Sequence, residues 1–410
     1  MALVVQKFGG TSVADPDRIR AVADHVARTR RRGDEVVVVI SAMGKETDDL
    51  IHLADQVSAA QPGREWDMLI TAGERKSMAL MSMALHEQGC PAESFTGSQA
   101  GIITDAGHTR AKILEVRADR LHEALGQGKV PVVGGAQGMS TDRNVTFLGR
   151  DASDITAVAL AAVLGADACE LYTDVSGVFT ADPRVVPGAR RLHRLSFEEL
   201  LEMTATGCPK PAMRSVEFAR NHGVRLHVRS AFTWEPGTWI TEEDRDMEQA
   251  IVSAITQDGS EAKVTVIGVP DKPGVAALMF RALADAGVNV DMIVQNVSVH
   301  GTTDISFTVP NGQLDDGMRV VDELRAEVGA TGVIADGDIG RVSLVGAGMK
   351  THPGVAATMF ETLAGEGINI EMISTSAIRI SCVVREDQME PAVRALHGAF
   401  KLDQAGPWDR

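Results

Sequence analysis

The C-terminal part of the chain contains an internal repeat, which constrains the fold more than any other feature of the sequence. The segment Pro273–Ala277 returns 80 residues later as Pro353–Ala357. At the same offset, Gly287–Ile293 returns as Gly367–Ile373, with conservative changes only. Each copy has the order strand, Pro-Gly turn, amphipathic helix, Gly-Asn turn and strand. The repeat therefore predicts two similar α+β modules in tandem.

The turn in each copy also indicates what the modules do. A Pro-Gly turn between a strand and a helix exposes backbone N–H groups of the first helical turn, and these suit a carboxylate ligand. The pattern favours ligand-sensing modules, and a duplicated unit with a purely structural role is the alternative. We expect the modules to span 262–338 and 339–402, after a polar, acidic linker within Trp234–Glu248.

The N-terminal part follows a different pattern, in which apolar strand-length runs alternate with helix-like segments. Val36–Ile40, Lys129–Gly134 and Ala168–Thr173 are continuous apolar runs typical of buried parallel strands. Arg18–Arg31 is one of the helix-like segments between them. This alternation predicts an α/β domain with a mostly parallel sheet over residues 1–245. Ligands of such sheets bind beyond the carboxyl ends of the strands.

Composition excludes several classes of function. The chain has 56 acidic and 40 basic residues and a net charge of −16, which argues against nucleic acid as the main partner. The apolar runs are far shorter than the ~20 residues of a membrane-spanning helix. Because the N-terminus also lacks a signal peptide, we expect a cytoplasmic protein with no membrane partner. The four cysteines form no CxxC pair, which argues against a disulfide framework or a zinc site.

The segment Gln6–Ser12 directly follows an apolar run at the start of the chain. Its two glycines, Gly9 and Gly10, would let backbone N–H groups approach a phosphate, and Lys7 would add a mobile positive charge. A lone Gly-Gly would favour a tight turn with a surface lysine, but the full string is more specific. It matches neither a Walker loop nor a dinucleotide-binding fingerprint.

The string Gln6–Ser12 resembles the opening of the aspartokinases in the amino-acid kinase superfamily. Further segments resemble the same family in the same order: Val39–Gly44, Thr71–Arg75, Phe95–Gly101 and Leu171–Arg184. The paired repeats resemble ACT modules, which bind amino-acid end products in this family. The chain is most similar to the actinobacterial type that is sensitive to lysine plus threonine.

The resemblance implies an amino-acid kinase fold, a mostly parallel sheet sandwiched by helices, followed by two α+β ferredoxin-like ACT modules that intertwine. It implies transfer of the γ-phosphate of ATP to the β-carboxylate of L-aspartate. The product, 4-phospho-L-aspartate, leads to lysine, threonine and methionine. Mg²⁺ would bridge the phosphates, and no protein metal ligand is assigned.

The resemblance also assigns residues to the site. The implied catalytic residues are Lys7, Arg150 and Asp154. Those implied to bind aspartate are Ser41, Thr47, Glu74, Arg150 and Ser153, with Glu74 facing the ammonium and Arg150 a carboxylate. Those implied to bind the nucleotide are Lys7, Gly9, Gly10, Thr173, Asp174, Phe179, Asp182, Arg184 and Lys210. Lysine or threonine as effector would contact Asp271, Gly274, Val275, Ala276, Asn289 and Gln295.

Two segments depart from the family pattern. Where the family usually has Gly-Arg-Gly-Gly-Ser-Asp, this chain has Asp151 and Ala152 in place of the third and fourth residues. Asp151 is repulsive towards a phosphate unless Mg²⁺ or a cation compensates, and it could instead recognise a cationic group on another substrate. The family's nucleotide-contacting lysine falls on Pro209, and Lys210 stands one place later. Phe147 replaces a small polar residue.

Three hypotheses follow from these departures. The chain is an aspartokinase with a shifted lysine, a kinase of the same fold acting on another amino acid or carboxylate, or a catalytically silent ligand sensor. The resemblance also implies a homo-oligomer in which the repeats of two chains interleave. Met247 is a candidate internal start for a separate small subunit.

Overall fold

The computed structural model describes residues 1–60, 63–242, 251–296 and 301–404. The candidate internal start Met247 lies outside these residues. Contacts along the chain divide it into two compact units. The first unit comprises Met1–Val178, Arg191–Thr204 and Pro209–Asp246, and the second comprises Phe179–Arg190, Ala205–Cys208 and Met247–Arg410. The expected boundaries 1–245, 262–338 and 339–402 stay predictions. Two short segments within 1–245 belong to the second unit.

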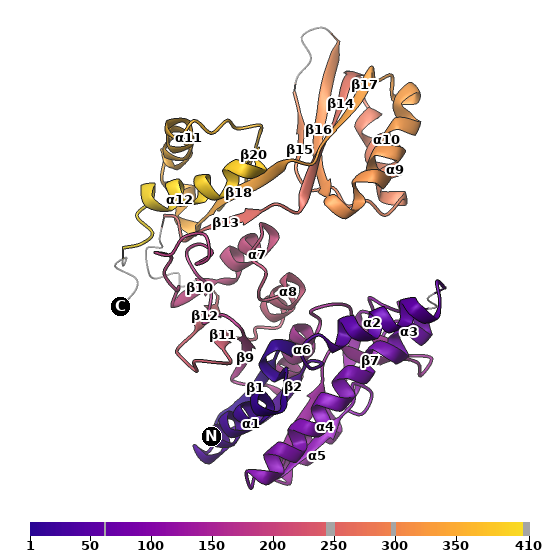
Figure 1. Cartoon of the computed structure of the whole chain (residues 1–410), viewed down its shortest axis with the longest axis vertical. Helices are drawn as coiled ribbons and strands as arrows, with labels where there is room; N and C mark the ends of the chain where they lie inside the picture. Colours follow the sequence, from indigo (N-terminus) through magenta and orange to yellow (C-terminus); the bar gives the residue numbers. More distant parts are fainter. Residues whose placement is uncertain (61–62, 243–250, 297–300, 405–410) are drawn as a thin grey trace. The chain divides into compact units, whose positions relative to one another are not determined.

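An eight-stranded sheet forms the centre of the first unit, in the order β10-β12-β11-β9-β1-β2-β6-β3 (Figure 1). All neighbouring pairs are parallel except β11 with β12. The strands are β1 (Leu3–Phe8), β2 (Glu35–Ile40), β3 (Ala92–Phe95), β6 (Val130–Gly134), β9 (Ala168–Thr173), β10 (Arg194–Ser196), β11 (Leu226–Ser230) and β12 (Thr238–Thr241).

A small second sheet in this unit has the order β5-β4-β7-β8. Its strands are β4 (Ile102–Thr104), β5 (Ile113–Val116), β7 (Gln137–Ser140) and β8 (Val145–Phe147). The helices of the unit are η1 (Gly10–Val13), α1 (Pro16–Arg31), α2 (Glu46–Val57), α3 (Gly63–Ile70), α4 (Ala72–Glu87), α5 (Asp119–Gly126), α6 (Ser153–Leu164), α7 (Phe197–Ala205) and α8 (Met213–Asn221).

Helices cover both faces of the central sheet. Val36 and Val38 of β2 pack with α1 and α4 in one core cluster. Val37 and Val39 are also fully buried, and because side chains alternate along a strand they point to the opposite face, where α6 packs against β1, β2 and β9. Ten of the 12 residues of α6 are buried, which explains why this helix lacks a polar stripe. The predicted sheet sandwiched by helices is confirmed.

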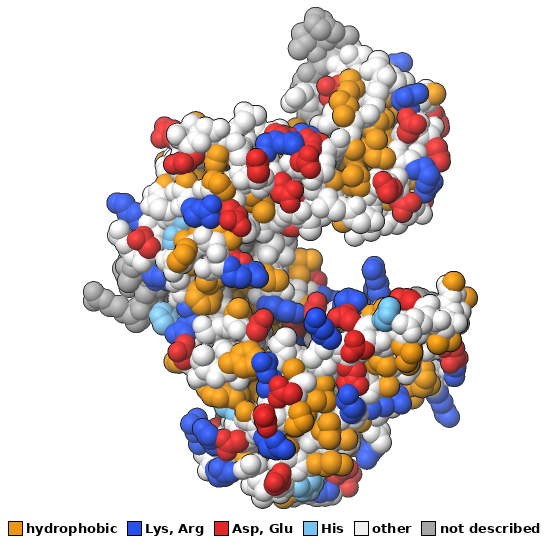
Figure 2. All heavy atoms as spheres, viewed as in Figure 1, with side chains coloured by type: hydrophobic (Ala, Val, Ile, Leu, Met, Phe, Trp, Pro, Cys, Tyr) orange, Lys and Arg blue, Asp and Glu red, His pale blue; other side chains and the backbone are white. Residues whose placement is uncertain are grey.

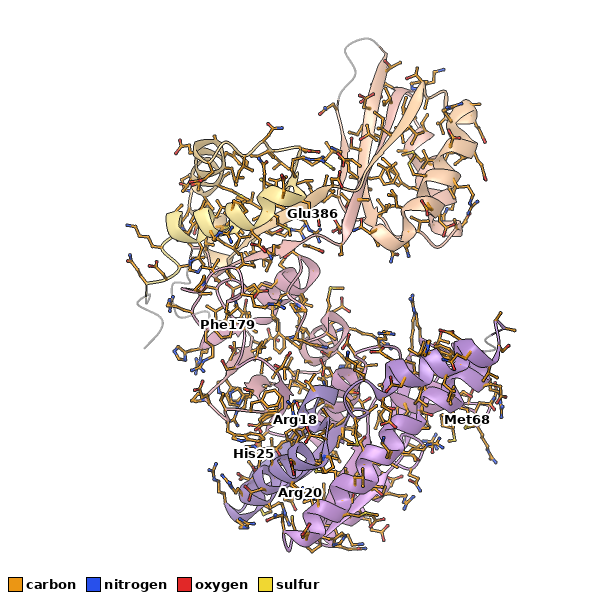
Figure 3. The ribbon with its side chains drawn as sticks, in the orientation of Figure 1. Arg18, Arg20, His25, Met68, Phe179 and Glu386 are labelled. Carbon is orange, nitrogen blue, oxygen red and sulfur yellow. The ribbon has the colours of Figure 1, made fainter. Side chains whose placement is uncertain are left out.

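A buried polar network joins β1, β9 and β11. The Glu170 carboxylate accepts hydrogen bonds from Gln6 (2.8 Å), Tyr172 (2.9 Å) and Arg229 (3.0 Å). Burial would raise the pKa of Glu170, but His227, Arg229, Gln6 and Tyr172 lower it to about 2. His25 on α1 (Figure 3) lies 2.7 Å from the Tyr172 hydroxyl, so the network also fixes this helix.

Two antiparallel sheets with helices form the bulk of the second unit. The first module contains β14 (Glu261–Pro270), α9 (Val275–Asp285), β15 (Ile293–Gln295), β16 (Thr302–Pro310), η2 (Asn311–Gln313), α10 (Leu314–Val328) and β17 (Gly332–Asp336). The second contains β18 (Ile339–Val345), η3 (Ala347–Thr351), α11 (Val355–Gly365), β19 (Met372–Thr375), β20 (Arg379–Arg385), η4 (Glu386–Gln388) and α12 (Met389–Ala399). The first sheet has the order β15-β16-β14-β17, and this ferredoxin-like arrangement confirms the predicted α+β modules.

The second sheet is completed by a strand from ahead of the first module. Strand β13 (Ala254–Asp258) pairs antiparallel with β18, and the order is β13-β18-β20-β19. In the first module the matching edge position is held by β17, the last strand of the repeat. The first module is thus inserted between β13 and the rest of the second module.

A buried arginine stands where the two modules meet. Arg341 on β18 is 2% exposed and forms ion pairs with Asp258 (3.1 Å), Glu261 (3.3 Å) and Asp291. It also donates a hydrogen bond to the Ala205 carbonyl (2.9 Å). One guanidinium therefore contacts both modules and the segment Ala205–Cys208, which belongs to the same unit.

Replacing Arg341 with methionine is expected to lower the free energy of unfolding by about 3 kcal/mol, because buried carboxylates lose their cation. Arg385→Met is the matched control: this strand arginine pairs with Asp336 and Glu371 but is 39% exposed, so solvent screens its charge and its loss is expected to destabilise the protein much less. Urea unfolding followed by circular dichroism compares the two variants. Equal destabilisation would contradict a special role for Arg341.

Candidate active site

Polar residues converge at the carboxyl edge of the central sheet. Lys7 lies near the end of β1, Ser41 follows β2, and Gly135 follows β6. Asp154 occupies the first turn of α6, which packs against these strands. This is the edge at which ligands of parallel sheets bind.

Lys7 and Asp154 form a buried ion pair. The Lys7 ammonium lies 2.6 Å from Oδ1 of Asp154, and the two side chains are only 6% and 2% exposed. Oδ2 of Asp154 also accepts a hydrogen bond from the Ala212 N–H (3.3 Å). The cation is held in place before any ligand arrives, so it can meet a phosphoryl group without rearrangement.

Close backbone approaches explain two of the glycines beside this pair. A Cβ on Gly10 would lie 2.8 Å from the Ala42 carbonyl oxygen, because the loop after β1 crosses the loop after β2. A Cβ on Gly135 would lie 2.6 Å from Oγ of Ser153. Ser153 in turn accepts a hydrogen bond from Ser41 (3.0 Å). The structure thus brings the predicted residues Ser41 and Ser153 together.

Glu74 presents a buried carboxylate in the first turn of α4. The residue is 3% exposed, and its Oε1 accepts the Ala42 N–H at 3.4 Å. Its Oε2 is buried without a hydrogen-bond partner among the described residues. Burial raises the pKa of Glu74 to about 7, against the lowering effect of the backbone N–H groups of Glu74 and Ala42. Such a group is suited to a ligand cation.

Gln137 on β7 is a polar residue that the sequence reasoning missed. Its Oε1 accepts the Gly97 N–H (3.4 Å), while its buried Nε2 has no partner among the described residues. A Cβ placed on Gly134 would lie 2.8 Å from this Nε2 and 3.3 Å from Cβ of Glu74. The amide donor therefore lies beside Glu74. The available signal in the sequence was a glutamine in a glycine-rich segment directly after a buried strand.

Arg150 lies apart from the buried pair. Its side chain is 69% exposed and forms an ion pair with Asp48 of α2 at 3.1 Å. Thr47, half-buried, is the second residue of the same helix. The structure thus places Thr47 in the first turn of α2 and Arg150 beside that turn. It does not bring Arg150 into contact with Lys7.

The two departures from the family pattern meet in space. Lys210 and Asp151 form an ion pair, although they stand 59 residues apart. Burial would raise the pKa of Asp151, but Lys210, Lys7 and Arg150 hold it below its usual value. Asp151 has a left-handed backbone with φ of 58°, which costs a non-glycine residue about 1 kcal/mol. An exposed ion pair contributes about 0–1 kcal/mol, so stability alone does not account for this arrangement.

The residues expected to surround the nucleotide are divided between the two units. Thr173 ends β9, its Oγ1 accepts the Val175 N–H (3.1 Å), and the exposed Asp174 follows it in the first unit. Phe179 (Figure 3), Asp182 and Arg184 belong to the second unit. There the Arg184 guanidinium lies 2.6 Å from the Asp182 carboxylate. Of the residues expected to bind the nucleotide, the structure places Gly9, Gly10, Thr173, Asp174 and Lys210 in the unit that contains Lys7.

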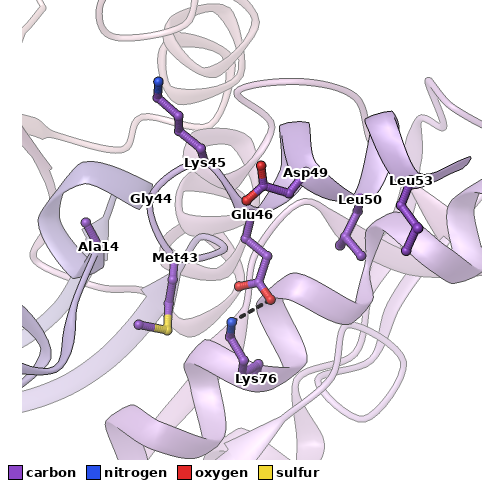
Figure 4. A pocket seen from close by; sticks show the side chains of 9 residues that line it. All are labelled: Ala14, Met43, Gly44, Lys45, Glu46, Asp49, Leu50, Leu53 and Lys76. Atoms are coloured by element: carbon purple, nitrogen blue, oxygen red, sulfur yellow. Dashed lines mark ion pairs between the residues drawn. The ribbon is translucent and has the colours of Figure 1, made fainter. Parts of the chain in front are cut away.

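A pocket of about 440 Å³ lies beside the loop after β2 (Figure 4). Leu50 and Leu53 of α2 line its apolar side, and the ion pair of Glu46 with Lys76 (2.6 Å) lines its polar side. Its lining includes neither Lys7 nor Glu74. The pocket therefore adjoins the converging residues without containing them.

The residues expected to bind an effector surround the start of α9 in the first module. Gly274 precedes this helix with φ of 98°, and Val275 and Ala276 are half-buried in its first turn. The backbone N–H of the exposed Asp271 donates a hydrogen bond to the Gly301 carbonyl (3.0 Å). The backbone N–H of Asn289 donates one to Oε1 of Gln313 (2.8 Å). Gln295 is exposed on β15, which lies at the edge of its sheet.

In the part of the chain that the structure describes, no group of three or more His, Cys, Asp or Glu side chains could hold a metal ion. Every helix in that part is too short or too polar to cross a membrane. Acidic and basic side chains are interspersed over the face drawn in Figure 2, so this face has no broad basic patch.

Comparisons with known proteins agree with this geometry. The model of the amino acid kinase family matches residues 2–230, and that of the ACT domain matches 264–324 and 342–400. The aspartokinase of Mycolicibacterium smegmatis is 55% identical over 410 residues, 98% of this chain and 97% of that protein. The Synechocystis aspartate kinase structure is 42% identical with a TM-score of 0.56, covering 100% of this chain and 71% of that chain. The structure of Escherichia coli aspartokinase III in complex with lysine and aspartate is 25% identical with a TM-score of 0.76. The match covers 97% of this chain and 99% of that chain.

The fold and the site together define a kinase domain of the amino acid kinase type joined to a pair of ACT domains. The sequence is more than 50% identical to curated aspartokinases over nearly their whole length, which narrows the class of kinase further. The chain belongs to the aspartokinases, the aspartate kinases of the amino acid kinase family.

Glu74→Gln is expected to stabilise the folded protein above pH 7. The pKa of Glu74 in the folded state, about 7, exceeds its ordinary value of 4.5, so protonation of Glu74 favours the folded state. This contribution to stability is complete below pH 4.5 and is lost as the pH rises to about 7. A neutral amide avoids this loss, which is on the order of 3 kcal/mol at pH 8. Urea midpoints at pH 5 and pH 8 measure it, with Glu87→Gln at the exposed end of α4 as control. A less stable Glu74→Gln variant at pH 8 would refute the idea.

Proposed function

We propose that this aspartokinase transfers the γ-phosphate of ATP to the β-carboxylate of L-aspartate. The observation that carries the proposal is the pairing of opposite charges at one sheet edge. A buried lysine, Lys7, is paired with Asp154, and Oε2 of the buried Glu74 carboxylate has no hydrogen-bond partner among the described residues, so it can accept a ligand cation. A phosphoryl group and the ammonium of an amino acid are the groups that this arrangement suits.

The proposed roles follow from the charges. Lys7 stabilises the phosphoryl group in transfer, and Asp154 orients Lys7 through their ion pair. Glu74 in its ionised form binds the aspartate ammonium, and Arg150 closes over a carboxylate once it leaves Asp48. Further contacts to aspartate come from Ser41, Thr47 and Ser153, and those to the nucleotide from Gly9, Gly10, Thr173, Asp174, Phe179, Asp182, Arg184 and Lys210.

Mg²⁺ is proposed to arrive bound to the phosphates of ATP. The described residues build no cluster of acidic side chains that could hold it alone. This ion is commonly bound through substrate phosphates with few protein ligands. When bound, it neutralises the charge that develops on the phosphoryl oxygens.

Lysine, with or without threonine, is proposed as the feedback effector. The lysine-bound aspartokinase III of Escherichia coli, 25% identical to this chain, supports lysine as a ligand of the type. The N-terminal backbone of α9, behind Gly274, offers N–H groups to the effector carboxylate. Asp271 and Asn289 are proposed to hold its polar groups, together with Gln295. Inhibition requires that the effector prefer an inactive arrangement.

The remaining partners are also proposals. Pairing of the ACT domains of two chains would make a homo-oligomer, and Met247 stays a candidate start for a small subunit. A cytoplasmic location fits a substrate and a nucleotide that both belong to central metabolism.

The purified protein is expected to form aspartyl hydroxamate from L-aspartate, ATP, Mg²⁺ and hydroxylamine. Lys7→Met should lower kcat by roughly 10²–10³, because the phosphoryl group loses its cation. Lys129→Met, which breaks an ion pair with Glu93 in the same unit, is the control and should leave kcat unchanged. Hydroxamate absent from folded wild type, but formed with another amino acid, would reassign the acceptor. No turnover with any acceptor would favour a silent sensor.

Lysine plus threonine is expected to inhibit hydroxamate formation, and Gly274→Asp should abolish the inhibition. The new carboxylate repels the effector carboxylate at the start of α9. Gly354→Asp is the matched control, because Gly354 precedes α11 with φ of 104°, close to the 98° of Gly274, so the backbone strain is equal. Loss of inhibition in Gly354→Asp alone would move the effector site to the second module.

A further inference from the structure

Two residues that depart from the family pattern form an ion pair with each other in the first unit. Asp151 stands where the family usually has glycine, and Lys210 stands one place after the usual lysine, which is here Pro209. The two side chains form a direct ion pair. Each departure alone is unfavourable, since one adds a negative charge near phosphates and the other removes a positive one. Together they restore the local balance of charge.

The pair lies close to the buried Lys7–Asp154 pair. Asp151 comes two residues before α6, which begins at Ser153, and its carboxylate lies within the field of Lys7 as well as Lys210. Asp154, one turn along, holds Lys7. The ammonium of Lys210 is therefore held at the N-terminal end of a buried helix, where anions such as phosphates bind.

A second contact fixes the loop that carries Lys210. The N–H of Ala212, two residues later, donates to Oδ2 of Asp154. Pro209 and Pro211 flank the lysine, so the backbone on both sides has restricted φ angles. The loop is thus attached to the start of α6 on both sides of Pro211, through Asp151 and through Asp154.

We propose that Asp151 is a positioning residue that holds Lys210 against the phosphates of ATP, so that the pair replaces the family's lysine at position 209. The proposal rests on the proposed kinase function, because it takes ATP as the ligand. An ammonium has three donors, so Lys210 can contact a phosphate oxygen while it keeps its bond to Asp151. Without Lys210, the Asp151 carboxylate would face the phosphates without its ion-pair partner.

The charges around Asp151 also argue against recognition of a cationic substrate by this residue. Its carboxylate already has Lys210 as a partner, and the charges of Lys7 and Arg150 act on it too. A further cation in the same place would meet three like charges. The departure at position 151 is therefore explained within this chain, by the departure at position 210.

Calorimetric titration of the full-length protein with MgATP, in the absence of aspartate, tests the pair without relying on turnover. The variants are Asp151→Asn, Lys210→Met and the double variant. Lys210→Met should weaken MgATP binding roughly tenfold, as expected for a lost charged hydrogen bond. Asp151→Asn should weaken binding in the wild-type background, because Lys210 loses its support, but strengthen it in the Lys210→Met background, because a repulsive charge is removed. This reversal of sign is the signature of positioning.

Two controls accompany the cycle. Asp151→Glu, which keeps the charge, should retain most of the wild-type affinity. Breaking the exposed pair of Glu115 with Arg117 in the same unit, by Glu115→Gln and Arg117→Met, should leave MgATP affinity unchanged and show no coupling. In the hydroxamate assay, KM for ATP should follow the calorimetric change in the variants, while KM for aspartate stays within about twofold of wild type.

Other outcomes overturn the proposal. Tighter binding by Asp151→Asn in both backgrounds would make Asp151 a simple repulsive charge, and an equal loss in both would make it a purely structural residue. A wild-type protein that binds no MgATP would overturn the pair and the kinase function together. By contrast, sign reversal in MgATP binding without hydroxamate formation would support the pair and reject only aspartate as the acceptor.

Discussion

The buried ion pair of Lys7 and Asp154 is the interaction on which the catalytic unit depends. Burying both charges is unfavourable unless each keeps its partner, so strand β1 and helix α6 must stay in register with one another. The carboxylate also sits in the first turn of α6, where the helix dipole favours a negative charge. Ser153, Asp151 and Ala212 are all positioned by the same helix start. The site is therefore built around one turn of α6 rather than around a flexible loop.

The parts of this arrangement that depend on local pattern could be predicted from the sequence. The apolar run Ala168–Thr173 is strand β9, and the helix-like run Arg18–Arg31 falls within α1. The 80-residue repeat predicted two α+β modules because each copy contains the same strand, turn and helix signals. Resemblance supplied Lys7 and Asp154 as site residues, and the geometry brings them within 2.6 Å of each other.

Tertiary pairing explains what the sequence could not predict. Strand β13 lies outside the repeat, and only its hydrogen bonds to β18 reveal that it completes the second sheet. The compensation of Asp151 by Lys210 joins residues 59 apart, and no periodicity links them. Gln137 is visible as a polar residue in a glycine-rich segment. Only the folded structure shows that its Nε2 has no partner among the described residues and lies near Gly134.

Two segments of the second unit lie close in sequence to residues that we propose to bind the nucleotide. The segment Phe179–Arg190 is bonded into the second unit, where Thr180 accepts the Ile255 N–H (2.8 Å) and lies 2.9 Å from His397. The segment Ala205–Cys208 is bonded there too, through Arg341 and the hydroxyl pair of Thr206 with Thr256 (2.6 Å). Thr173 lies six residues before the first segment, and Lys210 lies two residues after the second. Thr173 and Lys210, which we propose to contact the nucleotide, are therefore joined to segments of the second unit through short stretches of backbone.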